Sequence, residues 1–407
     1  ADAVYGGVSH FSLRIRSGKE FTMETFKEGI DYAHERGKKV YVTINGFPFN
    51  SQINLLKKHI QSMADLKPDA FIVAAPGVVR LCREIAPEIE IHLSTQANVL
   101  NYLDAQVFWD MGVRRIVVAR EISLKDVVEI KKHLPDMEIE IFVHGSMCFA
   151  YSGRCLVSAV QMGRVPNRGS CANDCRFEYT LYAANEDHSS LFRLEEEPGV
   201  GTYIFNAKDM NLASHIDEIL ASGAVDSLKI EGRTKSPYYA AVTANAYRMA
   251  IDDFYNDTFD EAKYQKELFT TKNRGFSDAY LIHKPFDRND TQNYDYSLSK
   301  GSYEVSGLVC EDETHFLCKY KTFPGTDVEI FLPQNAQVQE CENEIGKIYK
   351  KEDGKYYVNF KKILTEKNKE LEAVHSGNVN KIQLPGKLPY LTMLRIENEG
   401  EVVNPFA

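Results

Sequence analysis

The sequence predicts an α/β protein: a (β/α)8 TIM-like barrel with a cysteine-bearing insertion, followed by a small C-terminal antiparallel β-barrel domain. Two observations lead to this expectation. Up to about residue 235, short apolar runs alternate with amphipathic stretches of helical length, which is typical of a parallel sheet with crossover helices. Beyond residue 300, short alternating runs separated by Gly and Pro indicate antiparallel strands.

The first part of the chain contains eight strand-like runs whose near-continuous apolar character is typical of strands buried on both faces. Successive runs lie about 25 residues apart, as in (β/α)8 barrels. The strands are expected at residues 3–5, 39–44, 70–74, 90–94, 115–119, 138–144, 203–206 and 227–231. The helices are expected at residues 23–36, 52–66, 76–85, 99–111, 124–134, 210–222 and 237–256.

Eight strands match a closed barrel, but the first run has no helix before it and residues 203–206 follow a long insertion. We therefore expect that one leading βα unit is absent from this chain and that residues 203–206 are accessory. An open, doubly wound sheet is the alternative, because periodicity does not show closure.

The pattern divides the chain into a barrel at residues 1–260, with its insertion at about 145–201, and a β domain at 301–390. Residues 261–300 are expected to form a linker, and residues 391–407 a tail. In the β domain, strands are expected at residues 303–310, 315–320, 327–332, 347–349 and 355–360.

Composition restricts the possible classes of function. The 407 residues include 48 Lys and Arg against 58 Asp and Glu, a formal net charge of −10, so any nucleic-acid site must be a local patch. With 43% apolar and 26% charged residues, the chain is not disordered or collagenous. It shows neither the ~18 apolar residues of a membrane span nor a signal-peptide pattern, so we expect a cytoplasmic protein without a membrane partner.

Polar residues follow the predicted strands at the points where working residues of (β/α)8 enzymes sit. Each could instead be a helix cap or a solvated loop residue. Because parallel strands bring their carboxyl ends to one edge, we expect these side chains to converge. They are Asn45, Gln96, Glu121, His144, Lys229, Glu231 and Arg233.

Four of the eight cysteines fall within 28 residues, with six, fifteen and three residues between successive members. Four thiolates can hold an iron–sulfur cluster or a tetrahedral zinc ion. Zinc ribbons usually use pairs separated by two residues, so these wider gaps favour the cluster. A nucleophile pair of Cys148 with His144 is a competing interpretation. The four cysteines are Cys148, Cys155, Cys171 and Cys175.

The segment HGSMCFAYSGRCLVS at residues 144–158 closely resembles the signature of the collagenase-like peptidase family U32. Further matches lie at residues 167–171, 175–176, 206–210, 229–235 and 273–276, so the resemblance extends to about residue 285. The C-terminal β domain is similar to the module that ends the longer family members.

The resemblance implies oxygen-independent hydroxylation, because several family members are implicated in that chemistry. The segment at 167–171 and the β domain favour the tRNA-modifying branch, which implies 5-hydroxyuridine formation at the wobble position with a prephenate-linked donor. A 4Fe-4S cluster is implied on Cys148, Cys155 and Cys171, with Cys175 as the fourth ligand. Some relatives place that ligand near Asn211, which is not a cysteine here.

Residue types suggest roles under this hypothesis. Guanidinium and ammonium groups suit a small carboxylate donor, so Arg154, Arg233 and Lys229 are candidates to bind prephenate. His144 or Glu231 could move protons. We expect the cofactor-contacting residues to be Asn45, Gln96, Glu121 and Tyr151.

A tRNA partner requires local positive charge. The candidate basic stretches, for which a solvated face is the alternative, are Lys347, Lys350, Lys351, Lys355, Lys361, Lys362 and Lys367. Two other functions stay open: a U32 peptidase with Cys148 or a metal-bound water as nucleophile, and a non-catalytic RNA-binding or assembly protein. The sequence does not identify a protein partner.

Overall fold

A computed structural model describes residues 1–8, 11–12, 21–148, 150–166, 171–176, 179, 182–184, 191–193, 207–232, 235–285, 288–293, 301–332 and 336–398. The chain forms two compact units. The first comprises Ala1–Lys235, Ala246–Gln265 and Asn273–Ser299, and the second comprises Ser236–Asn245, Lys266–Lys272 and Lys300–Ala407.

The first unit is built on a sheet in which seven strands run parallel in the order β1-β2-β3-β4-β5-β6-β10. β9 joins antiparallel to the last residues of β6, and β11 pairs parallel with β9. The predicted strands of this part are confirmed except residues 203–206, which lie outside the described residues. The strands are β1 (Ala3–Gly6), β2 (Lys39–Ile44), β3 (Ala70–Val73), β4 (Glu90–Leu93), β5 (Arg115–Val117), β6 (Glu138–Ser146), β9 (Asp209–Asn211), β10 (Ser227–Ile230) and β11 (Phe276–Ser277).

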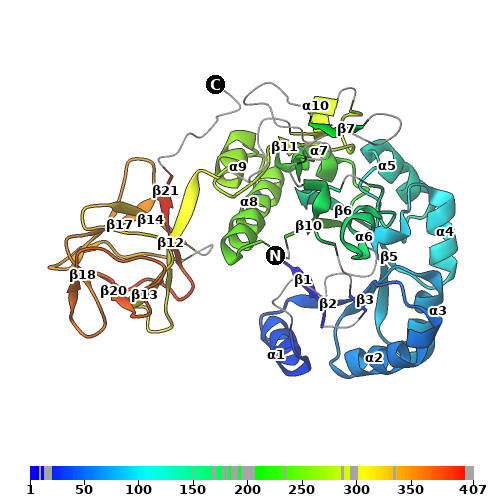
Figure 1. The fold of residues 1–407 in the computed structure, drawn as a ribbon, viewed down its shortest axis with the longest axis horizontal. Coiled ribbons are helices and arrows are strands. Elements are labelled where there is room, and N and C mark those ends of the chain that lie inside the picture. Colours follow the sequence, from blue (N-terminus) through cyan, green and yellow to red (C-terminus); the bar gives the residue numbers. More distant parts are fainter. Residues whose placement is uncertain are drawn as a thin grey trace. The chain divides into compact units, whose positions relative to one another are not determined.

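Crossover helices form an arc outside these strands (Figure 1). Thr22, Asn101 and Ser123 cap three of them, each side chain accepting a backbone N–H of the first turn. Buried apolar residues such as Ile30 and Ile60 face the sheet, as their helical spacing requires. The helices are α1 (Met23–His34), α2 (Ile53–Asp65), α3 (Pro76–Ile85), α4 (Tyr102–Asp110), α5 (Leu124–His133), α6 (Val157–Met162), α7 (Ile216–Ala221), α8 (Pro237–Tyr255), α9 (Glu261–Leu268) and α10 (Arg288–Thr291).

Closure of the sheet into a (β/α)8 barrel is not confirmed. Within the described ranges no backbone ladder joins β1 to β10. Their side chains nevertheless meet, since Lys229 Nζ of β10 lies 4.2 Å from the centre of the Tyr5 ring of β1. Tyr5 Oη also donates a hydrogen bond to Glu231 Oε2, directly after β10, at 2.8 Å. What the structure shows is a mixed α/β unit with a parallel sheet.

The predicted helix at residues 210–222 is wrong in its first half. Asp209–Asn211 forms β9 instead, opposite residues 144–146 of β6, and the helix begins at Ile216. A strand of three residues has too few positions to show an alternating pattern, and edge pairing with β6 decides its conformation. The insertion also contains an unpredicted helix, α6, and a two-stranded hairpin of β7 (Tyr182–Ala184) and β8 (Leu191–Arg193).

The second unit contains an eight-stranded antiparallel sheet that curls on itself (Figure 1). Its order is β15-β16-β17-β14-β21-β12-β13-β20, and its core includes Phe316, Phe360 and Leu394. The strands are β12 (Tyr303–Val309), β13 (His315–Cys318), β14 (Asp327–Phe331), β15 (Cys341–Glu342), β16 (Gly346–Lys350), β17 (Tyr356–Phe360), β20 (Ile382–Gln383) and β21 (Met393–Glu397), beside a hairpin of β18 (Ile363–Leu364) and β19 (Glu370–Leu371).

Two predicted boundaries differ from the structure. The expected linker at 261–300 contains α9, β11 and α10, and the expected tail contains β21 in the middle of the sheet. β21 escaped prediction because Arg395 interrupts its apolar alternation, yet Arg395 is buried between Glu267 and Glu329. A buried arginine with two carboxylate partners looks like an exposed residue in the sequence.

The described part of the chain contains no helix that is both long and apolar enough to cross a bilayer.

Candidate functional site

A cavity of about 520 Å³ lies at the carboxyl ends of the parallel strands of the first unit. Its wall includes nine of the thirteen residues that the sequence singled out, among them four of the seven strand-end residues that were expected to converge. These nine are Asn45, Gln96, Cys148, Tyr151, Cys155, Cys171, Cys175, Lys229 and Glu231.

The cysteine-bearing segment packs directly against two strand ends. Gly153 has φ +73°, and a Cβ there would lie 2.3 Å from the carbonyl oxygen of Gln96, so only glycine fits. The neighbouring Ser152 N–H donates to Glu121 Oε1 at 3.0 Å, and Thr95 Oγ1 lies 3.5 Å from Ser152 Oγ. Glu121 therefore orients this segment from beneath and is not part of the cavity wall among the described residues.

All four clustered cysteines are reduced thiols, and they line this one cavity. Burial raises the pKa of the Cys155 thiol, and the negative charges of Cys148 and Cys171 raise it further. A positively charged inorganic group among these thiols would relieve the repulsion between their thiolate forms.

Among the described residues, no three of the cysteine sulfurs lie within 4.8 Å of one another. The four thiols are therefore a candidate ligand set for either inorganic group that the sequence predicts, an iron–sulfur cluster or a zinc ion.

Arg120 lies beside the first of these thiols. Its guanidinium stacks on the Phe142 ring at 4.0 Å, and Nη1 lies 3.7 Å from Cys148 Sγ. The described hydrogen-bond neighbour of Cys148 is therefore Arg120, and the Cys148–His144 nucleophile pair finds no support in these contacts.

His144 lies in the interior and not on the cavity wall. It is 1% exposed, its Nδ1 is 3.3 Å from Tyr247 Oη, and its ring packs on Phe276. Burial lowers the pKa of His144 to about 3. The imidazole is thus neutral and packed, which is the geometry of a core histidine.

The strand ends provide a row of amides and hydroxyls along one side of the cavity. Asn45 Nδ2 lies 3.5 Å from Ser94 Oγ, which in turn donates to Gln96 Oε1 at 3.4 Å. These are neutral donors and acceptors, so they can orient a polar ligand without adding charge.

Lys229 reaches the cavity from β10, but its charge is already balanced. Its Nζ lies 2.6 Å from Glu140 Oε1 and 4.2 Å from the centre of the Tyr5 ring. Burial alone would raise the pKa of Glu140, but Lys229 and Arg115 outweigh it and bring that pKa to about 2. Lys229 is therefore part of an internal ion pair.

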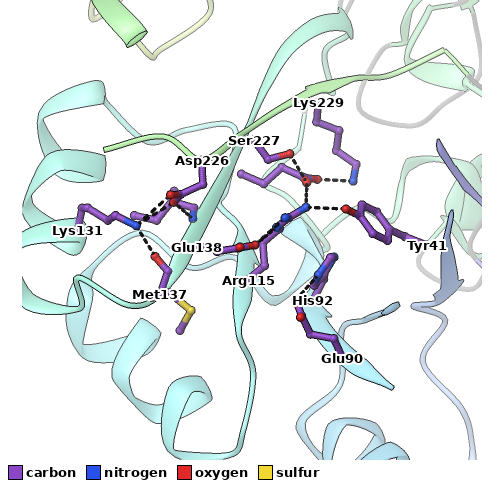
Figure 2. Close-up of polar contacts among 12 residues, drawn as sticks. Tyr41, Glu90, His92, Arg115, Lys131, Met137, Glu138, Asp226, Ser227 and Lys229 are labelled. Atoms are coloured by element: carbon purple, nitrogen blue, oxygen red, sulfur yellow. Dashed lines mark hydrogen bonds and ion pairs between the residues drawn. The ribbon is translucent and has the colours of Figure 1, made fainter. Parts of the chain in front are cut away.

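Arg115 continues this ion pair toward the other end of the sheet (Figure 2). Its guanidinium contacts Glu138 at 2.6 Å, Glu140 at 3.4 Å and Tyr41 Oη at 3.3 Å. Glu90 and His92 lie at that same end, 2.8 Å apart, and form with Glu138 a group of three potential metal ligands. Because Arg115 already pairs with Glu138, this group carries its own counter-charge.

Glu231 is held at the cavity by its neighbours on both sides. Tyr5 Oη donates to its carboxylate, and the backbone of Gly145 approaches it so closely that a Cβ would lie 2.4 Å from the Glu231 carbonyl oxygen. Gly145 has φ +124°, which favours glycine at this position.

The remaining predicted residues lie elsewhere. Arg154 is exposed, and its Nη1 donates to the Gly153 carbonyl at 3.1 Å. Arg233 is outside the described residues. The wall contains three further cations: Arg120, Arg164 and Lys235. The sequence pointed to Arg120 as a strand-end residue and to Lys235 as part of the family motif at 229–235, whereas Arg164, which follows the left-handed Gly163 at the end of α6, was missed.

Three of the seven lysines of the second unit that were candidates for RNA contact form ion pairs. Lys351 pairs with Asp327 at 2.9 Å, Lys355 with Glu329 at 3.0 Å and Lys361 with Glu342 at 2.6 Å. The other four, Lys347, Lys350, Lys362 and Lys367, stay candidates for RNA contact.

Comparison with known proteins agrees with the sequence motifs. The tRNA hydroxylation protein P of Helicobacter pylori is 64% identical over 397 residues, covering 98% of this chain and 94% of that protein. The Escherichia coli protein of the same name is 37% identical over 391 residues, covering 85% of each. A collagenase of Porphyromonas gingivalis is 31% identical over 295 residues, covering 69% of each. Residues 1–291 match the model of Peptidase family U32, and the chain belongs to that family.

Proposed function

We propose that this protein is an iron–sulfur enzyme that hydroxylates a uridine of tRNA without molecular oxygen, at the wobble position and with a prephenate-linked donor. One observation carries the proposal: a single cavity joins four reduced thiols to the polar ends of the parallel strands. The names of the relatives at 64% and 37% identity support RNA hydroxylation as the activity.

The four cysteines would hold a 4Fe-4S cluster on the cavity wall. When bound, the cluster supplies one-electron transfer at this site. Arg120 is the residue of the chain that would orient Cys148 and reduce the negative charge of the ligand set, because its guanidinium already lies against that sulfur.

Other side chains of the cavity would bind and orient the substrates. Asn45 and Gln96 offer hydrogen bonds to a nucleobase edge or a donor hydroxyl, and Arg120 and Arg164 offer charge to a carboxylate. Glu231, which accepts a hydrogen bond from Tyr5, is the carboxylate in position to take a proton at Oε2. His144 is left out because its ring is buried away from the cavity.

The test combines metal analysis with tRNA analysis. Protein purified anaerobically should contain about four irons per chain, and Cys148→Ser, Cys155→Ser, Cys171→Ser or Cys175→Ser should remove most of them. Cys341→Ser, at a half-buried thiol outside the cavity, is the matched control and should keep the iron. In a strain lacking the gene, wild type but none of the four variants should restore 5-hydroxyuridine in tRNA, measured by mass spectrometry.

Two results would contradict the proposal. Unchanged tRNA nucleosides in the deletion strain would exclude the activity. Full iron content in all four variants would exclude the ligand assignment while leaving the activity open to other chemistry.

A further inference from the structure

Exposed apolar side chains are concentrated on one part of the cysteine-bearing insertion. Between residues 151 and 165 five large apolar residues are exposed, in a protein whose other large apolar side chains are mostly buried. Clusters of this kind mark interaction sites rather than ordinary surface. Their exposed fractions are 62% for Tyr151, 64% for Leu156, 81% for Val160, 54% for Met162 and 37% for Val165.

Tyr151 differs from the other four because it also lines the cavity. Its ring thus belongs both to the exposed surface and to the wall that carries the thiols. An exposed aromatic ring beside a polar cavity is the arrangement with which proteins stack unpaired nucleobases.

Arg164, from the same segment, provides an independent indication of an anionic ligand. It lines the cavity, and its buried Nε has no hydrogen-bond partner among the described residues. A buried donor of this kind is normally paired. Arg120 lies on the same wall, whereas Lys235 there already pairs with Asp209 at 3.9 Å. Among the described residues, Arg120 and Arg164 are thus the cations of this wall for which no carboxylate partner is observed, in a chain whose net charge is −10.

We propose that residues 151–165 form the RNA-contacting surface of the cavity, with the Tyr151 ring stacking on the base of an unpaired nucleotide and Arg164 binding a phosphate next to it. The inference rests on the proposed function and specifies how its substrate is held. A base that undergoes chemistry must leave its stack, and an aromatic ring at the cavity entrance replaces the lost stacking.

The stacking part is tested by binding of the anaerobically purified protein to a fluorescent 17-nucleotide RNA stem-loop with unpaired uridines, followed by anisotropy. Tyr151→Ala should weaken binding roughly 5- to 150-fold, the range measured for aromatic stacking on bases. Tyr151→Trp should restore it. Tyr255→Ala is the matched control, since Tyr255 is 72% exposed and does not line the cavity.

The phosphate part is tested by the salt dependence of the same binding. Arg164→Gln should weaken binding and reduce the slope of log K against log salt by about 0.7, as expected for one phosphate contact on a single strand. Arg80→Gln, an exposed arginine that pairs with Glu84 on α3, is the control and should leave the slope unchanged. Iron content and thermal unfolding of each variant report any general damage.

The outcomes separate this inference from the proposed function. If wild type restores tRNA hydroxylation but Tyr151→Ala binds RNA as tightly as wild type, the stacking surface is wrong and the activity stands. If wild type binds no RNA, the inference is likewise overturned, and the nucleoside analysis alone judges the activity. If wild type fails to restore hydroxylation, the proposed function is wrong, whatever the binding shows.

Discussion

The two ends of the parallel sheet in the first unit are built from the same strands but treat polar groups in opposite ways. At the amino end, Arg115, Glu138 and Glu140 satisfy one another in a continuous set of ion pairs (Figure 2). At the carboxyl end, the cavity wall keeps four reduced thiols and the Nε of Arg164, which has no partner within the described part of the chain. Balanced charge at one end serves stability, whereas unbalanced groups at the other end are available to a ligand.

The comparison predicts that substitutions at the two ends of the sheet change different properties of the protein. Substitutions in the paired end should reduce the free energy of unfolding, because they leave buried charges alone. Substitutions in the cavity should change binding and metal content with smaller effects on stability.

The largest effect is expected for Glu140→Ala. It leaves Lys229 and Arg115 buried without their shared carboxylate, which should cost about 3–5 kcal/mol of unfolding free energy. Denaturant unfolding measures it. Glu138→Ala is the control: Glu138 is 44% exposed, so its loss should cost under about 1 kcal/mol. Equal losses for the two variants would show that burial does not distinguish them.

Gly153→Ala should have the next largest effect on stability and should also change the iron content. A Cβ would collide with the Gln96 carbonyl at a position with φ +73°, at a cost of about 2–3 kcal/mol. We also expect iron content to fall, since the segment with Cys148 and Cys155 would move. Gly163→Ala has φ +64° but no atom near its Cβ, so it should cost only about 1 kcal/mol and keep the iron.

Mild acid should destabilise the protein through His144. Its folded pKa of about 3 lies below the ordinary 6.5, so between these values the unfolded chain binds a proton that the folded chain excludes. Stability should therefore fall by about 1.6 kcal/mol from pH 6.5 to pH 5. His144→Phe should remove this part of the pH dependence of stability, whereas His133→Gln, at an exposed histidine, should keep it. Chemical unfolding of both variants and wild type at several pH values tests this expectation.

Glu121→Ala should have the smallest effect, about 1 kcal/mol, because it removes the acceptor of the Ser152 N–H. Thermal unfolding would detect it against Glu88→Ala, an exposed carboxylate with no expected effect. A loss of iron without a loss of stability would instead indicate that Glu121 contacts the cofactor, as the sequence suggested.

Much of the first unit could be predicted because its strands are buried on both faces. The apolar runs predicted as strands at residues 39–44 and 70–74 matched the structure within a residue. The cysteine segment was equally visible, since four thiols within 28 residues are typical of a shared inorganic ligand. Arg164 was missed because it follows the glycine that ends α6, where no hydrophobic periodicity points to a function.

The sequence by itself determined the alternation of strands and helices, the cysteine cluster and the family, because these follow from local hydrophobic period and residue spacing. Only the tertiary structure decided which polar side chains are accessible in the cavity and which are buried or neutralised by an ion pair. His144 and Lys229 look like catalytic groups in the sequence, but packing buries the first and pairs the second with Glu140. Burial and ion pairing depend on residues far apart in the chain, so no local pattern contains them.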